Sequence, residues 1–280
     1  MVGAPETCRL MAPRLVLSEV NTGRVGAALA RRLADLPHAF AWQLSSESRK
    51  NRAGLAAYQD LHKGRRCIIL ANGPSLAHAD LEPLKDEITF GMNRIYLNFG
   101  KMGFESTYFL CINELVLEQF GSEIAALSMP KFLNWNRRSL FQGLNPSPHY
   151  LRFRLGLRDD FQTDASRALS SGGTVTYAAL QLAFFMGFRQ VILVGLDHRF
   201  ASRGTPNQME TRDFSADKDH FRPDYFPPGA RWQLPDLRRS ELAYAQARRA
   251  YEADGRQILD ATLDGACTAF EKANYKELFF

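Results

Sequence analysis

A continuous apolar run placed directly before a glycine-proline turn constrains the fold of this chain more than any other feature. Residues 67–71 read Cys-Ile-Ile-Leu-Ala and follow two arginines. A short run without polar alternation is typical of a strand buried on both faces, as in a parallel sheet. We expect a helix after the turn, with Ser75 as its cap. The turn itself reads Asn72-Gly73-Pro74-Ser75-Leu76.

Strand-like and helix-like patterns alternate over the rest of the chain. Further strands are expected at 87–92, 107–112, 131–133, 150–153, 190–195 and, as the last, 257–261. Helical patterns occupy 25–36, 174–188 and 235–254. This alternation predicts an α/β fold with a doubly wound, mostly parallel, Rossmann-like sheet. A polar stretch rich in Pro, Asp and Arg follows the strand ending at Gly195, and its length is typical of a lid.

The first 64 residues differ from the remainder. They are predicted to form a helical N-terminal extension, residues 1–64, before an α/β domain at 65–280. No apolar run approaches the ~20 residues that cross a bilayer. Charged Glu6 and Arg9 stand where a signal peptide needs an apolar centre, so we expect a cytoplasmic protein.

The net charge of +5 comes from basic residues dispersed along the chain. Nucleic-acid binding needs a basic stripe with interleaved aromatic residues or a known module, and neither occurs, so no nucleic-acid partner is expected. A mild positive balance suits an anionic small molecule. Peripheral contact with a membrane and homo-oligomerisation both stay open.

Polar residues follow four of the expected strands at one edge of the sheet. Asn72, Asn93, Asn113 and Asp197 each come just after a strand. Ligands of open parallel sheets bind at the carboxyl ends of the strands, and a helix N-terminus there favours anions. Gly73 allows close approach of the backbone to a phosphate. One asparagine alone is typical of a turn, but four polar ends together favour a binding cleft.

Three segments resemble the MptE-like family, whose namesake makes 6-hydroxymethylpterin diphosphate. They are residues 71–76, residues 91–96 and the stretch from Met186 to His198. The closing stretch, with Asp219-His220-Phe221 and later Ile258-Leu259-Asp260, is similar to bacterial members of that family. The resemblance covers about 65–280. It implies diphosphate transfer from ATP to a pterin alcohol, with Mg²⁺ held by carboxylates.

The same frame is similar to the bacterial sialyltransferases of glycosyltransferase family 42. That resemblance implies that a lid histidine, His220, removes the proton of the acceptor hydroxyl and that Tyr225 holds the leaving phosphate. Tyr225 follows the histidine here, which departs from the order in that family. It further implies that the CMP part of the donor is held by residues at the strand ends and before the helix at 174–188. These nucleotide-binding residues are Asn72, Gly73, Pro74, Ser75, Asn93, Asn113, Ser171, Gly172 and Asp197.

Two chemistries and a non-catalytic alternative follow. The preferred one is glycosyl transfer from a CMP-activated acidic sugar to a glycan or small-molecule acceptor, which needs no metal or other cofactor if protein donors stabilise the phosphate. The second is the pterin diphosphokinase reaction, with Mg²⁺ held by carboxylates. The candidates are Asp197, Asp217, Asp219 and Asp224, of which Asp197 and Asp219 are preferred. The third is a nucleotide-binding or scaffold protein on the same frame. In the glycosyl transfer, histidine is a suitable general base near neutral pH, and His220 is the candidate.

Overall fold

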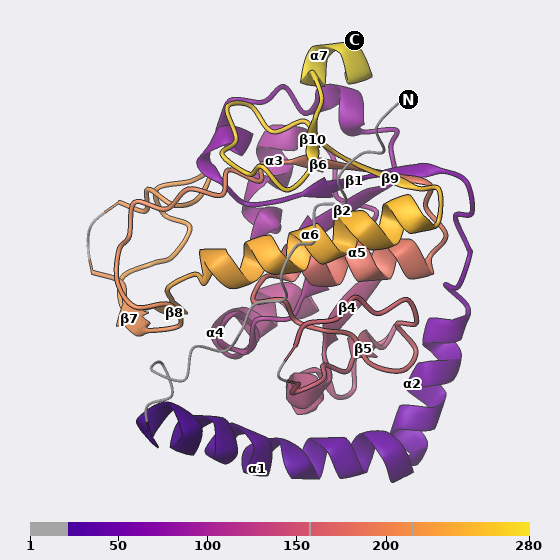
Figure 1. Cartoon of the computed structure of the whole chain (residues 1–280), viewed down its shortest axis with the longest axis vertical. Coiled ribbons are helices and arrows are strands. Elements are labelled where there is room, and N and C mark those ends of the chain that lie inside the picture. The colour runs from indigo at the N-terminus through magenta and orange to yellow at the C-terminus, as the bar shows by residue number, and fades with distance from the viewer. Residues whose placement is uncertain (1–21, 157, 214–215) are drawn as a thin grey trace, which may run out of the picture.

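The computed structural model describes residues 22–156, 158–213 and 216–280. The expectations that concern Glu6, Arg9 and the first part of the predicted extension lie outside the described residues. Within the described chain, the dominant feature is a sheet of eight strands with helices packed on it (Figure 1). The predicted α/β fold is therefore confirmed.

All eight strands of the main sheet run parallel, in the order β10-β9-β6-β1-β2-β3-β4-β5. Seven of them match expected strands. The strand expected at 257–261 is present as β9, but it is not the last, because the unpredicted β10 follows it. The strands are β1 (Arg66–Leu70), β2 (Thr89–Met92), β3 (Tyr108–Cys111), β4 (Lys131–Asn134), β5 (His149–Leu151), β6 (Gln190–Val194), β9 (Gln257–Asp260) and β10 (Glu271–Lys272).

The path of the chain reverses direction at β1. Strands β2 to β5 are added on one side of β1, and the chain then returns to place β6 on its other side. Leu70 at the end of β1 pairs with Val194 at the end of β6. The turns after these two strands therefore lie at the topological switch point, where ligands of open α/β sheets bind.

The helices are packed around this sheet. They are α1 (Thr22–Leu44), α2 (Ser46–Ala56), α3 (Phe99–Met102), α4 (Glu114–Ala125), α5 (Val175–Phe185), α6 (Leu237–Ala253) and α7 (Tyr275–Phe279), with short 3-10 segments η2 (Pro74–Ala77), η3 (Glu82–Leu84), η4 (Ile95–Asn98) and η5 (Trp135–Phe141). Helix α5 packs on β1, β2 and β3, and α6 lies beside α5 and against β9 (Figure 1). No helix among the described residues is long and apolar enough to cross a membrane.

Helix α5 is buried along almost its whole length, which explains its continuous apolar sequence. Its one fully buried amide side chain, Gln181, has a positional role. Gln181 accepts the N–H groups of Gln162 and Ser170, at 3.1 and 3.0 Å, and donates to the Ser170 carbonyl at 2.7 Å. A buried amide must be satisfied in this way. The loop that leads to Ser171 is thereby fixed against the helix.

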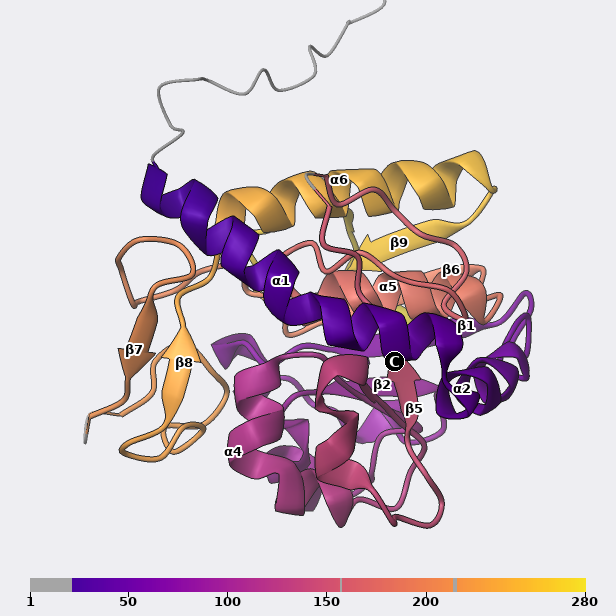
Figure 2. The ribbon, with the colours of Figure 1, turned by 90° about the horizontal axis from the view of Figure 1, so that it is seen from below.

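Helices α1 and α2 of the predicted extension pack against the β4–β5 side of the sheet. The rings of Trp42 and Trp135 meet edge to face at 5.0 Å, and the Trp135 indole donates to the His38 carbonyl at 3.0 Å. Asn51 of α2 exchanges two hydrogen bonds with the backbone of Tyr150. Figure 2 shows α1 crossing the molecule toward α2 from the side of the hairpin formed by β7 (Met209–Thr211) and β8 (Arg231–Gln233). The helix expected at 25–36 in fact continues through Pro37, since these contacts hold its second half.

The expectation of a helix capped by Ser75 is wrong. Only the single 3-10 turn η2 follows Gly73, and no side chain caps it. The segment cannot continue as an α-helix, because Asp80 accepts the backbone N–H of Glu82 and Pro83 has no N–H of its own. The Ser75 hydroxyl bonds elsewhere, as described below.

The predicted lid, residues 198–235, contains regular structure that the sequence did not indicate. Strands β7 (Met209–Thr211) and β8 (Arg231–Gln233) form an antiparallel hairpin separate from the main sheet. Gln119 of α4 exchanges two hydrogen bonds with the backbone of Arg231 and so ties the hairpin to the domain.

Candidate functional site

A cleft of about 770 Å³ lies at the carboxyl edge of the sheet, between the lid, α1 and the start of α5. Most of the predicted site residues meet there, whereas Pro74, Ser75 and Gly172 do not line it. Helix α1 contributes Asp35 and His38, which the sequence did not single out. The predicted residues that line the cleft are Asn72, Gly73, Asn93, Asn113, Ser171, Asp197, Asp219, His220 and Tyr225.

The turn after β1 holds an anion that belongs to the protein itself. The Asp197 carboxylate, after β6, accepts the Ser75 N–H at 3.1 and 3.2 Å and the Ser75 hydroxyl at 2.7 Å. The Gly73 N–H donates to the Gly195 carbonyl at 3.0 Å. Burial raises the pKa of Asp197, and the Ser75 hydrogen bonds act in the opposite direction. These two backbone donors are thus already used, which corrects the expectation that they face a phosphate.

Gly73 is required by this close approach. A Cβ atom at residue 73 would lie 1.9 Å from the Asp197 Oδ2 and 2.7 Å from the Gly195 carbonyl oxygen. Such contacts are far inside van der Waals distance, so the turn after β1 tolerates only glycine without rearrangement. The glycine therefore allows the turns after β1 and β6 to contact each other through Ser75–Asp197 and Gly73–Gly195. We call this contact the seam between β1 and β6.

Asn72 has one amide atom paired and the other unpaired. Its Nδ2 donates to the Met92 carbonyl at 3.0 Å, at the end of β2. Its Oδ1 is buried and has no hydrogen-bond partner among the described residues. Buried acceptors without partners are rare in folded proteins, so this oxygen indicates a place for a ligand donor such as an amino group or a hydroxyl.

The two other predicted asparagines hold their side chains differently. Asn93 takes a left-handed backbone conformation, with φ of 51°, and accepts the Cys111 thiol at 3.5 Å. Asn113 caps α4, because its Oδ1 accepts the N–H groups of Leu115 and Val116 at 3.0 and 3.4 Å. The cap is the turn-forming role that a single asparagine suggests. Both residues still line the cleft.

Asn134 is a fourth strand-end asparagine that the sequence reading missed. It closes β4, lines the same cleft, and donates from Nδ2 to the Ile112 carbonyl at 2.9 Å. Asn72 makes the same kind of bond, because its amide at the end of β1 donates to the Met92 carbonyl at the end of the neighbouring strand β2. The signal that could have found it was present, since Asn134 directly follows the expected strand at 131–133.

The lid places an Asp–His pair at the cleft. The Nδ1 atom of His220 lies 3.0 Å from Asp217 Oδ2, and the Asp217 side chain is fully buried. Burial alone would raise the pKa of Asp217, but the hydrogen bond and charge of His220, the Asp219 amide and Arg212 together lower it. An ionised carboxylate only accepts, so Nδ1 is the nitrogen that donates to Asp217, and in the neutral imidazole the lone pair is then on Nε2. Among the described residues no hydrogen bond engages Nε2.

Tyr225 lies beneath this histidine. The two rings stack in parallel with centroids 3.9 Å apart, and the Tyr225 hydroxyl accepts the Arg94 N–H at 3.2 Å. Burial raises the pKa of Tyr225 far above its ordinary value, so the phenol stays protonated and able to donate. Arg94 also donates from its guanidinium to the Tyr225 carbonyl and packs on the Phe120 ring at 3.8 Å. The sequence reading gave Arg94 no role, although it follows Asn93 directly.

The lid is docked on the sheet edge in this structure. The Phe221 N–H donates to the Asn72 carbonyl at 3.1 Å, and Arg222 donates to the Leu97 carbonyl at 2.7 Å. Asp219 accepts the Ser202 hydroxyl at 2.6 Å and so holds the first part of the lid against the second. His220 is therefore held over the strand ends by bonds on both sides of it.

The element before α5 is fixed by an ion pair. Arg239 pairs with Asp159 at 2.6 Å and donates to the Ser171 hydroxyl at 3.0 Å. The Gly172 N–H donates to Asp159 at 3.1 Å, and a Cβ at Gly172 would lie 2.4 Å from the Tyr177 ring. Gly172 therefore shapes the loop, whereas Ser171 and Arg239 line the cleft.

The carboxylates considered for Mg²⁺ accept hydrogen bonds from other groups of the protein. Asp197 bonds to Ser75, Asp219 to Ser202, and Asp224 forms a two-pronged pair with Arg222. Within 22–156, 158–213 and 216–280, no group of three or more His, Cys, Asp or Glu side chains could hold a metal ion. Asp197 and Asp219 thus do not fit a Mg²⁺ site built from this chain alone.

The family model for 6-hydroxymethylpterin diphosphokinase MptE-like proteins matches residues 46–203, which is more than half of the chain. This chain belongs to the MptE-like family. The match begins at the start of α2, inside the segment expected as an extension. It includes the turn after β1, the strand-end asparagines and the seam between β1 and β6, but it ends before the Asp–His pair of the lid.

The MAf glycosyltransferase from Magnetospirillum magneticum AMB-1 is a solved structure to which this chain is similar in arrangement. The likeness has a TM-score of 0.49 and 15% sequence identity, over 81% of this chain. This chain spans only 38% of the length of that protein. No curated protein matches the sequence.

Proposed function

We propose that this MptE-like chain is a transferase that binds a nucleotide-activated donor in the cleft and uses His220 as its general base. One observation carries the proposal: the Asp217–His220 pair, with an unengaged Nε2, belongs to a lid docked on the strand ends at the topological switch point. A carboxylate that fixes the tautomer and orientation of a histidine is the usual support of a catalytic base.

The preferred reaction is glycosyl transfer from a CMP-linked acidic sugar to a hydroxyl of a glycan or a small molecule. The acceptor oxygen forms a bond to the anomeric carbon, its proton passes to Nε2 of His220, and the bond from that carbon to the CMP phosphate oxygen breaks. Asp217 stabilises the imidazolium that forms, because a buried carboxylate lies 3.0 Å from Nδ1.

The charge on the departing CMP phosphate needs donors at the cleft. The amides of Gly73 and Ser75 are engaged within the protein, so this role falls to the Tyr225 and Ser171 hydroxyls and the Arg239 guanidinium, all of which line the cleft. Donors of this kind stabilise charge that develops in the transition state. The unpaired Oδ1 of Asn72 suits the amino group of the cytosine or a ribose hydroxyl.

Family membership favours a second candidate, diphosphate transfer from ATP to a pterin alcohol. His220 would act on the pterin hydroxyl in the same way. Mg²⁺ would then arrive with the ATP phosphates, since the carboxylates of the described residues form no site of their own. A third reading, a nucleotide-binding scaffold, predicts binding without turnover.

An activity assay with two arms tests the proposal. The first arm follows release of CMP from CMP-N-acetylneuraminate and other CMP-linked acidic sugars in the presence of mixed glycan acceptors. The second follows formation of AMP from ATP, Mg²⁺ and 6-hydroxymethylpterin. CMP release that is lost in His220→Ala supports the preferred reaction, whereas AMP formation alone replaces it with the second. Ligand binding without either product would contradict the assignment of His220 as a base.

A further inference from the structure

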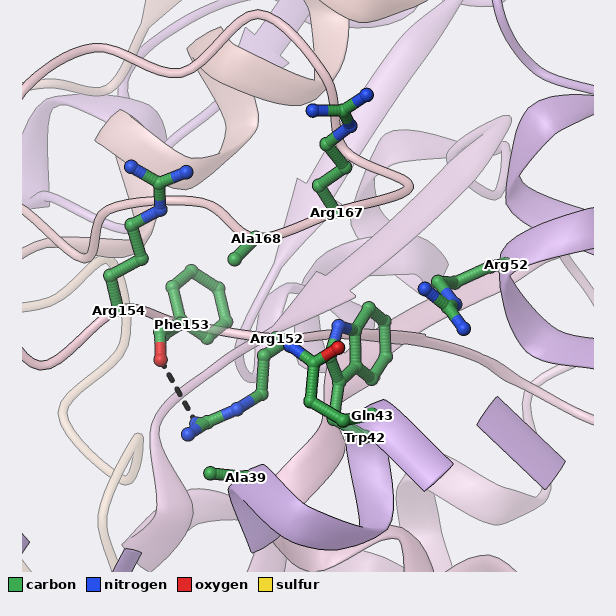
Figure 3. A pocket seen from close by; sticks show the side chains of 9 residues that line it. All are labelled: Ala39, Trp42, Gln43, Arg52, Arg152, Phe153, Arg154, Arg167 and Ala168. Atoms are coloured by element: carbon green, nitrogen blue, oxygen red, sulfur yellow. Dashed lines mark hydrogen bonds between the residues drawn. The ribbon is translucent and has the colours of Figure 1, made fainter. Parts of the chain in front are cut away.

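A second pocket, of about 550 Å³, lies between α1, α2 and the chain that follows β5. Four of its nine lining residues are arginines, and none of the nine is acidic. The arginines come from three separate segments, and their guanidinium groups stand apart around the pocket (Figure 3). We call it the arginine pocket; its charged members are Arg52, Arg152, Arg154 and Arg167.

The positive charge of this pocket is only partly neutralised. Arg152 forms a buried ion pair with Asp35 and donates to the Phe153 carbonyl at 2.9 Å. Arg167 pairs with Asp164 at 3.1 Å, but both side chains are largely exposed, so solvent screens that pair. Two arginines remain with their charge unpaired.

Arg52 and Arg154 have no carboxylate partner among the described residues. Arg52 lies over the Trp42 ring at 5.9 Å. Within the part of the chain that the structure describes, no hydrogen bond or ion pair engages the Arg154 side chain, which is exposed. Arginines placed around one concave surface without lining carboxylates give it a positive potential, which favours an anion there. A phosphate group matches their planar, two-pronged donor geometry.

The pocket also offers apolar surface and a shared wall with the cleft. Ala39, the Trp42 ring, Phe153 and Ala168 line it beside the arginines (Figure 3). The organic part of a phosphate ester can pack on this apolar surface, whereas a free inorganic anion has no apolar group to bury there. Arg152, Phe153 and Arg154 line both the arginine pocket and the cleft of the proposed active site.

We propose that the arginine pocket is a second anion-binding site, which holds a phosphate group carried by the acceptor while the cleft holds the donor. Its assignment to the acceptor rests on the proposed function. Its assignment as a phosphate site does not, because it rests on the lining of the pocket, of which Trp42, Arg52 and Arg167 do not line the cleft.

Calorimetric titration with glucose 1-phosphate, and separately with inorganic phosphate, tests the inference. Arg52→Ala and Arg154→Ala remove guanidinium groups without stranding a carboxylate, so both variants should fold. We expect each to weaken binding roughly tenfold, as loss of a charged hydrogen bond does. Arg249→Ala is the matched control, since Arg249 is exposed on α6 and lines neither pocket. Asn72→Ala tests whether the probe enters the cleft instead.

Binding that Arg52→Ala and Arg154→Ala weaken, and that Arg249→Ala and Asn72→Ala leave unchanged, supports the site. Tighter binding of glucose 1-phosphate than of inorganic phosphate assigns it to an organic phosphate, and equal binding assigns it to the free anion. Absence of binding, or equal weakening by Arg249→Ala, overturns the inference. If CMP fails to bind while glucose 1-phosphate binds in this pattern, the proposed donor is wrong and the phosphate site stands.

Discussion

At the sheet edge Asp197 and Ser75 bond to each other, whereas in the lid Asp217 bonds one nitrogen of His220 and leaves the other unengaged. Both pairs join an acidic side chain to a polar one at the same cleft. The first closes the seam between β1 and β6, and the second points to proton transfer. The comparison shows that a polar residue at a strand end indicates a cleft, but its hydrogen-bond partner decides what the residue does.

The two regions also differ in how they are supported. The sheet edge is fixed by β1, β2 and β6, which are almost completely buried. The lid is held by hydrogen bonds such as those of Phe221 to Asn72 and of Arg94 to Tyr225, and by the burial of its Phe226 and Trp232 rings. His220 itself makes no bond to the sheet edge, so we expect substitution of Gly73 at the edge to act mainly on stability and substitution of His220 to act mainly on turnover.

The largest effect is expected for His220→Ala. Loss of a positioned general base lowers turnover by about 10²–10⁴-fold. CMP affinity should change little, because the imidazole makes no bond to the sheet edge. Thermal stability should fall, because the buried Asp217 carboxylate loses one of its partners and the Tyr225 ring loses the ring stacked on it. His78→Ala is the control, since His78 is exposed and does not line the cleft. Steady-state kinetics with the active donor measure the change, and unaltered turnover would remove the distinction between the two regions.

The second-largest effect is a loss of stability on substitution of Gly73 at the sheet edge. Gly73→Ala forces a Cβ into Asp197 and the Gly195 carbonyl, and such overpacking costs about 1–3 kcal/mol of unfolding free energy. Urea denaturation measures the loss. Gly100→Ala is matched to it, because no atom lies within 4 Å of a Cβ at Gly100, and it should be neutral or stabilising. Equal stability of the two variants would show that the seam between β1 and β6 is not tight.

The third effect separates the ligand role of Asn72 from its structural role. Asn72→Ala removes the bond to Met92 and the unpaired Oδ1, so CMP affinity should fall roughly tenfold, as for a lost polar contact. Asn98→Ala is the comparison, since Asn98 is equally buried with an unpaired amide but lies outside the cleft. Isothermal titration distinguishes them. An affinity loss of the same size in both variants would mean that Asn72 acts only through the fold.

The smallest effect is a difference in response to acid. The pKa of Asp217 lies below its ordinary 3.8, so its ionised form stabilises the fold above that pH and the contribution is lost as pH falls through the lowered pKa. The pKa of Asp197 lies above 3.8, so its ionised form costs stability, and the cost disappears as pH falls through the raised pKa.

Comparison of Asp217→Asn and Asp197→Asn with the parent chain between pH 3 and pH 6 measures this difference. On acidification the stability advantage of the parent should shrink relative to Asp217→Asn and grow relative to Asp197→Asn. The same trend in both variants would contradict the opposite electrostatic environments of the two carboxylates.

Much of the fold could be predicted because buried parallel strands have a recognisable local sequence pattern. The runs at 67–71 and 190–195 are apolar throughout since both faces are buried, and they match β1 and β6 closely. The hairpin β7–β8 gave no such signal, because its strands are three residues long and largely exposed. Helix α1 passes through Pro37, where local rules predict an end, because contacts with Trp135 from a distant segment hold it.

The candidate site was predictable in position but not in its bonds. Strand ends locate Asn72, Asn93 and Asp197, since topology alone brings them to one edge. That Asp197 would occupy the turn, or that Arg94 would hold Tyr225, depends on pairings across 122 and 131 residues that no local pattern encodes. The Asp217–His220 pair could have been predicted from the sequence, because the two residues are only three positions apart.

The central claim is that the cleft at the switch point binds the nucleotide of an activated donor. Calorimetric titration with CMP, and separately with ATP plus Mg²⁺, tests it most directly, using the parent chain and Asn93→Ala. The account predicts saturable CMP binding without metal that Asn93→Ala weakens. Metal-dependent binding of ATP with no response to CMP would contradict the preferred donor, and silence toward both nucleotides would contradict the claim itself.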